Sequence, residues 1–309
     1  MDDFQSVGYQ NFISSHIRLN YYIKISTGAV LNLDNTYTEP KELSGFLNKI
    51  IINAGERWTP TILQDPHDTI KKVTNDLAKS GVIWVYSAFD TFFKKIEGEL
   101  SGNFKSENSN AEKDLEDKSH KLIELYEKLG WDQTKIKELL PILRFYEALR
   151  HSVAHNMGFP SRKIIEIFKS DEFIKAIDNW KTKSPERQIS PPPIVTDSEI
   201  DLQPHHPILY SETCLRIASD INVQLFTLLG KNHFINKTVK KHLLDTQTLT
   251  KPHCQNLSRY IAYHLNCDYK IQLEKYNNVH DIFNDSEIGI EKIKEYKKRY
   301  FTLKNIIDK

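Results

Sequence analysis

The chain has 309 residues, of which 39% are hydrophobic and 27% charged, a composition typical of a globular protein with a substantial core. Its formal net charge of +1 at pH 7 excludes a strong overall attraction to nucleic acid or membranes, so such recognition must be local. Three scattered cysteines exclude a disulfide framework and indicate a reducing compartment. With no visible secretory signal or apolar run of membrane-spanning length, we expect a cytoplasmic protein that does not contact a membrane.

Residues 1–67 form an N-terminal region whose main pattern is that of paired strands. Apolar side chains alternate with mostly polar ones over residues 17–25 and again over residues 29–33, which is the period of a half-buried strand. The intervening residues 26–28 end in a glycine and can turn the chain, so the pattern predicts a β-hairpin. A short helix is expected to follow Pro40.

From residue 68 to residue 230 the apolar period becomes helical. Apolar residues recur at spacings of three and four and predict helices over about residues 68–100, 121–130, 132–158, 163–180 and 208–229. Six of the twelve prolines lie in residues 184–207 and predict an extended connector.

Residues 231–309 are expected to be a helical, basic C-terminal extension, with fifteen Lys and Arg against nine Asp and Glu. The predicted fold is therefore mainly α. It consists of a bundle of four to five helices in residues 68–230, an N-terminal β-hairpin region and this extension.

A candidate active site lies near the end of the predicted helix 132–158, in the sequence LRHSVAHNMG of residues 149–158. It places Arg150 and His155 five positions apart. An imidazole transfers a proton near neutral pH, and a guanidinium holds a phosphate through two parallel hydrogen bonds. Together, these two side chains are the minimum needed to cleave RNA without a metal ion.

The spacing within this motif favours a site completed by a second chain. Because each helical residue advances about 100°, Arg150 and His155 lie about 140° apart on a straight helix. Either the long arginine side chain reaches sideways, or a second copy completes the site. We therefore expect a homodimer with this helix near its two-fold axis, and an apolar face with Tyr146, Val153 and Met157 contributing to the contact.

The segment around Arg150 resembles the R-x4-6-H signature of HEPN (higher eukaryotes and prokaryotes nucleotide-binding) domains. In that family a polar residue usually follows the arginine, and here that residue is His151. The aromatic-rich run over residues 84–90 resembles the family's opening helix, and the resemblance covers about residues 68–230. It implies a helical bundle that dimerises so that two motifs face one cleft. It also implies either a metal-independent endoribonuclease, often a toxin or anti-phage effector, or a member that has lost catalysis.

Carried onto this chain, the resemblance implies that His155 is the general acid and base and that Arg150 binds the phosphate. Glu147, one turn before Arg150, would orient the guanidinium, and His151 and Asn156 would support the site. The expected substrate is RNA, and an antitoxin, sensor or other regulatory protein is an expected partner. An inactive member would instead bind RNA, a nucleotide or a partner protein. Without the resemblance, Arg150 and His155 are a surface ion-pair partner and a structural histidine near a helix end.

Two other histidine patterns support weaker hypotheses. The motif spacing recurs at Arg259 and His264, but the residues between them predict a packed helix interior, with Ile261 and Tyr263 buried, more than a second active site. His151 and His155 are four residues apart and match a zinc-binding spacing. No third ligand is evident in the sequence, so we expect no metal and no cofactor.

Basic residues of the C-terminal extension are candidates for contacts with an RNA backbone. They are Lys240, Lys241, Lys297, Lys298 and Arg299. An ordinary solvated helix face explains the same residues and is the simpler interpretation.

Overall fold

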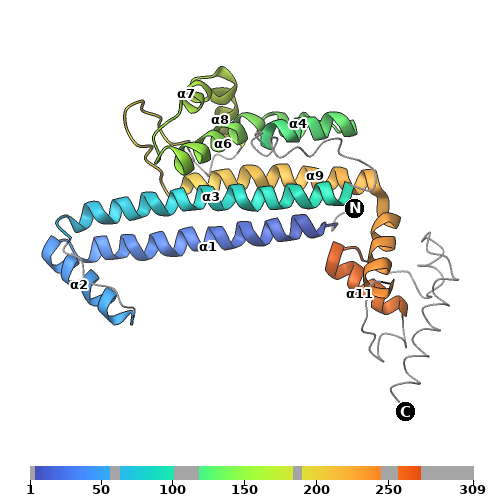
Figure 1. Cartoon of the computed structure of the whole chain (residues 1–309), viewed down its shortest axis with the longest axis horizontal. Coiled ribbons are helices and arrows are strands. Elements are labelled where there is room, and N and C mark those ends of the chain that lie inside the picture. The colour runs from blue at the N-terminus through green and yellow to red at the C-terminus, as the bar shows by residue number, and fades with distance from the viewer. Residues whose placement is uncertain (1–3, 56–62, 101–117, 184–189, 245–256, 273–309) are drawn as a thin grey trace, which may run out of the picture. The chain divides into compact units, whose positions relative to one another are not determined.

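The computed structural model describes residues 4–55, 63–100, 118–183, 190–244 and 257–272, and every regular element within these ranges is helical (Figure 1). The mainly α fold predicted from the sequence is therefore confirmed. The elements are α1 (Val7–Thr36), α2 (Pro40–Asn53), α3 (Pro66–Leu100), α4 (Lys118–Leu129), α5 (Thr134–Lys137), α6 (Leu140–His155), α7 (Arg162–Phe168), α8 (Asp171–Lys183), α9 (His205–Val239), the π-helix η2 (Lys240–Leu244) and α11 (Leu257–Tyr269). None of the described helices is long and apolar enough to cross a membrane.

The predicted N-terminal β-hairpin is wrong, because residues 17–33 lie within the single helix α1. The helix buries Phe12, Leu19 and Ile23, at 1–2% exposure, and leaves Tyr21 and Ile25 exposed. Alternation over a few residues does not distinguish a strand from a helix whose exposed face also carries apolar side chains. What selects the helix is packing against α3, where the ring of Phe12 contacts those of Phe89 and Phe92 at centroid distances of 5.7 and 5.8 Å.

The chain forms two compact units, residues 11–218 and residues 1–10 together with 219–309. The sequence-based boundaries at residues 67 and 230 stay a prediction. In the first unit α6 is central, because it packs against α3, α4, α5, α7 and α8. In the second unit the side chain of Asn222 accepts from the backbone N–H of Ser6 and donates to the carbonyl of Phe4, each over 2.8 Å. These two bonds hold the N-terminal segment of the chain on α9.

Close packing in the first unit depends on Gly81 of α3. A Cβ atom at this position would lie 2.8 Å from Cβ of Pro207 in α9 and 3.1 Å from Cδ1 of Ile23 in α1. Contacts this short force neighbouring atoms to move. Gly81 therefore allows α1, α3 and the start of α9 to meet.

The helix that carries Arg150 and His155 is shorter than predicted. The predicted helix 132–158 is divided into α5 and α6, and α6 begins at Leu140 with Pro141 in its first turn. Proline favours a first helical turn because it has no N–H group to leave unsatisfied. Just before α5, the carboxylate of Asp132 accepts from the N–H of Thr134, the first residue of that helix, over 2.9 Å.

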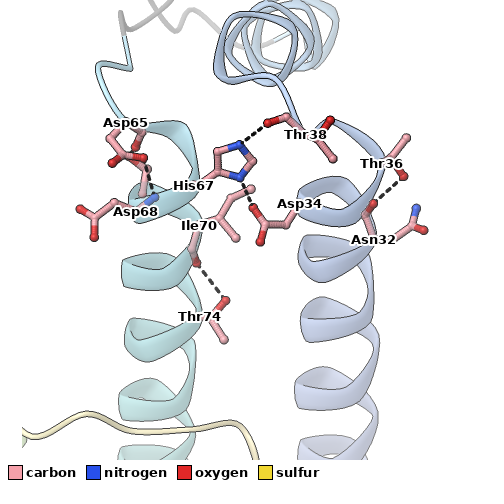
Figure 2. Close-up of polar contacts among 10 residues, drawn as sticks. Asn32, Asp34, Thr36, Thr38, Asp65, His67, Asp68, Ile70 and Thr74 are labelled. Carbon is pink, nitrogen blue, oxygen red and sulfur yellow. Dashed lines mark hydrogen bonds and ion pairs between the residues drawn. The ribbon is translucent and has the colours of Figure 1, made fainter.

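A histidine joins the end of α1 to the start of α3 (Figure 2). Nδ1 of His67 lies 2.6 Å from Oδ1 of Asp34, and Nε2 lies 3.2 Å from the carbonyl oxygen of Thr38. Both neighbouring atoms are acceptors, so both contacts are hydrogen bonds only when the imidazole is doubly protonated. The bond to Asp34 is the main cause that raises the pKa of His67, burial opposes it, and the Thr38 carbonyl and Asp65 add smaller increases.

We expect acidic pH to strengthen this contact between α1 and α3. Because the pKa of His67 is raised in the folded chain, its stabilising contribution is fully present below the ordinary value of 6.5 and is lost as the pH rises through the folded-state pKa. An NMR titration of the imidazole measures that pKa directly, and Asp34→Asn is expected to lower it. The melting-temperature difference between wild type and Asp34→Asn should shrink as the pH rises. A His67 pKa at or below 6.5 contradicts this prediction.

Candidate functional site

The candidate site lies at the C-terminal end of α6. The helix ends at His155 because the chain then enters left-handed backbone conformations, with φ of 53° at Met157 and 85° at Gly158. The N–H groups of Asn156 and Gly158 both donate to the carbonyl oxygen of Ser152 over 3.0 Å and complete the last turn. The predicted end of this helix at residues 158–160 is thus three to five residues beyond its observed end.

Arg150 is directed from α6 towards α3. Its Cζ atom lies 4.5 Å from the centre of the Tyr86 ring, and the side chain is half-buried. The Nε atom is buried without a hydrogen-bond partner, and no acidic side chain in the described residues forms an ion pair with Arg150. The guanidinium carbon therefore lies over an aromatic ring, and the positive charge of Arg150 is not neutralised by a carboxylate in the described part of the chain.

His155, the last residue of α6, is exposed, as are His151 and Asn156. The rings of His151 and His155 lie 4.8 Å apart at an angle of 50°. The turn that follows exposes two apolar side chains, with Met157 at 85% and Phe159 at 48% exposure. The end of α6 thus offers solvent two imidazoles beside an apolar surface.

Glu147 is buried, at 5% exposure, one turn before Arg150. Its carboxylate accepts from the Ser119 hydroxyl at 2.7 Å and from the Ser119 backbone N–H at 3.1 Å. Glu147 therefore ties α6 to the first turn of α4, where unpaired N–H groups and the helix dipole favour a negative charge. Its expected role in orienting Arg150 stays a prediction.

A second carboxylate near Tyr86 is already paired with cations. Asp90, one turn after Tyr86 on α3, forms ion pairs with Lys118 and, over 2.9 Å, with Lys94. Burial acts to raise the pKa of Asp90, but the bonds from Lys118 and Lys94 hold it below its ordinary value. Asp90 is thus an ionised partner of these two lysines.

Two stacked tyrosines lie in the core behind the site. The rings of Tyr146 (α6) and Tyr210 (α9) are 4.8 Å apart and nearly parallel, at 5°. Burial is the main cause that raises the pKa of both phenols; Glu147 raises that of Tyr210 further, and Arg150 lowers it. The expectation that Tyr146 contributes to a dimer face is wrong, because its side chain is fully buried.

The second pair with the same spacing, Arg259 and His264, has different surroundings from Arg150 and His155. Arg259 on α11 is exposed, and the ring of His264 stacks on His242 with centroids 3.8 Å apart. Ile261 is buried as predicted, whereas Tyr263 is 63% exposed, contrary to the prediction.

The C-terminal basic residues fall partly within the described chain. Lys240 and Lys241 are exposed on η2, and Lys241 donates to Asp268 of α11 over 3.0 Å. Nε2 of His242 contacts the same Asp268 oxygen at 2.8 Å. Burial acts to raise the pKa of Asp268, but bonds from His242 and Lys241 hold it below its ordinary value. Lys297, Lys298 and Arg299 lie outside the described residues.

Sequence reasoning missed Tyr86 and Tyr210 as neighbours of the site. They lie on α3 and α9, far from residues 149–158 in the chain. The sequence marks Tyr86 only as part of the aromatic-rich run over residues 84–90, and it does not single out Tyr210. Within the described residues, no group of three His, Cys, Asp or Glu side chains is arranged to hold a metal ion. Comparison of the chain with known protein families, curated proteins and solved structures finds no significant match.

Proposed function

We propose that the chain is a metal-independent endoribonuclease of the HEPN type, with a role as a toxin or anti-phage effector. The observation that carries this proposal is the state of Arg150. Its guanidinium is held against Tyr86 without an acidic partner in the described residues, at the same helix end as the exposed imidazole of His155. An arginine without an acidic partner in the described residues and an accessible histidine at the same helix end can supply the charge stabilisation and the proton transfers of metal-independent phosphate-ester cleavage.

In the proposed reaction the 2′-hydroxyl of the ribose attacks the adjacent phosphorus. A neutral imidazole of His155 removes the hydroxyl proton, and an imidazolium returns a proton to the departing 5′-oxygen. Arg150 stabilises the negative charge that grows on the phosphate oxygens. The products are a 2′,3′-cyclic phosphate and a 5′-hydroxyl.

Two proton transfers on opposite sides of the phosphorus support a homodimer. One His155 serves one side at a time, and a two-fold axis near the end of α6 would bring in the second. Met157 and Phe159, both exposed, offer apolar area for this contact. An antitoxin, sensor or other regulatory protein would control the activity.

A catalytically silent module that binds RNA, a nucleotide or a partner protein is the second candidate. The observation in its favour is that no hydrogen bond to a described residue fixes the ring of His155, whose only ring contact among them is with His151. An acid–base histidine is commonly oriented by a bond to its second nitrogen. In the dimeric enzyme that bond would come from the substrate or from the second copy.

The test is incubation of the purified full chain with single-stranded RNA in EDTA. The proposed enzyme cleaves the RNA, leaves a 2′,3′-cyclic phosphate, and spares DNA because DNA lacks the attacking hydroxyl. RNA that stays intact but is bound supports the silent module. Products with a 5′-phosphate, or DNA cleavage at a similar rate, exclude the proposed mechanism.

A further inference from the structure

We infer that Tyr86 of α3 is a positioning residue for Arg150: its ring, which lies against the guanidinium carbon, restricts the side chain without neutralising the charge that would bind a phosphate. This inference rests on the proposed ribonuclease function for its consequence in catalysis. Its structural part concerns only Tyr86 and Arg150, whose Cζ-to-centroid distance is 4.5 Å.

The geometry of a guanidinium explains why an aromatic platform suits this role. The five N–H groups lie in the guanidinium plane, and an aromatic ring has no carboxylate oxygen to bind them. The ring therefore restricts the side chain without neutralising its charge. A carboxylate in the place of Tyr86 would bind the same edges as the phosphate and cancel the charge that the reaction requires.

The surroundings of Tyr86 hold the platform in place. Val82, Val85 and Phe89, on the same stretch of α3, are at most 1% exposed and anchor the helix in the core. Nearby Asp90 is bound to Lys118 and Lys94, so the carboxylate one turn away is already engaged. Tyr86 and Arg150 also both affect the pKa of Tyr210 on α9, which places the three side chains within electrostatic reach of one another.

The activity test compares Tyr86→Phe with Tyr86→Leu in steady-state RNA cleavage. Phenylalanine keeps the ring face, so we expect cleavage within about twofold of wild type. Leucine removes it, and kcat should fall by about three- to thirtyfold, the range that corresponds to a partly desolvated cation–π contact. KM should change less, because the guanidinium acts most strongly on the charge of the transition state.

Trp84→Leu is the matched control. Trp84 is also a half-buried aromatic residue of α3, and its ring contacts an arginine, Arg18, at 5.7 Å. This variant removes a comparable contact from the same helix away from Arg150. It should leave kcat unchanged even if it lowers the melting temperature, whereas an equal fall in kcat for both leucine variants would overturn the inference.

A second readout separates positioning from catalysis. In wild type and Tyr86→Phe, the ring current should shift the Arg150 Nε–H resonance in NMR spectra, and Tyr86→Leu should return it towards the value of a solvated arginine. If the wild-type chain does not cleave RNA, the proposed function fails while this shift still tests the contact. An Nε–H resonance that is the same in wild type and Tyr86→Leu overturns the positioning role, whatever the activity.

Discussion

His155→Ala and Arg150→Ala are each expected to lower RNA cleavage by at least about a hundredfold, the effect of removing a general acid–base group or a transition-state charge stabiliser. The fold should survive both changes. His155 is exposed at the end of α6, so its truncation removes no core contact. Arg150 is half-buried and loses its contact with Tyr86, so a small fall in melting temperature is expected for that variant alone. Cleavage rates and melting curves of the same preparations check both statements.

The control pair is Arg259→Ala and His264→Ala, which alters the same sequence spacing on α11. These variants should keep most of the activity. His264→Ala should reduce stability locally, because the ring of His264 stacks on His242 at 3.8 Å. If the 259 and 264 variants are inactive and the 150 and 155 variants active, the site assignment is wrong. Loss of activity in all four would indicate a composite site that uses both motifs.

Glu147→Ala is expected to cost about 3 kcal/mol of unfolding free energy, a larger loss of stability than we expect for Arg150→Ala or His155→Ala. The substitution removes the acceptor of two Ser119 donors, the hydroxyl at 2.7 Å and the backbone N–H at 3.1 Å, and leaves both buried. It also removes the negative charge that Glu147 of α6 places next to the first turn of α4. Urea titration followed by circular dichroism measures the change.

Glu138→Ala provides the comparison for a surface carboxylate. Glu138 pairs with Lys183, but the two side chains are 45% and 60% exposed, so the loss should be at most about 1 kcal/mol. The loss of unfolding free energy for Glu147→Gln should lie between those for Glu147→Ala and Glu138→Ala. The amide oxygen still accepts from Ser119, but the negative charge is lost. Equal losses for Glu147→Ala and Glu138→Ala would show that the buried contact with α4 contributes little.

Local pattern was sufficient for much of the helical part of the fold. The spacing of apolar residues predicted α3 and α4 close to their observed ranges, because each helix buries one face and that face repeats with the helical period in the sequence. The single helix predicted over residues 163–180 is instead divided into α7 and α8. The proline cluster correctly predicted that the described residues 190–204 are not helical. The motif itself was also visible, since Arg150 and His155 are neighbours along the chain.

Tertiary structure decided the features that no pattern within one segment of the sequence predicts. Whether residues 17–33 form strands or a helix depends on the partner that buries them, and in the structure they form a helix whose Tyr22 ring contacts that of Trp84 on α3 at 5.7 Å. The same dependence applies to the site. The sequence by itself determined which residues carry an imidazole and a guanidinium. Only packing of α6 on α3 brought Tyr86 against Arg150, and only packing of α6 on α4 bound Glu147 to Ser119. Contacts between helices distant in the chain arise from how their faces meet, and no pattern within one segment encodes them.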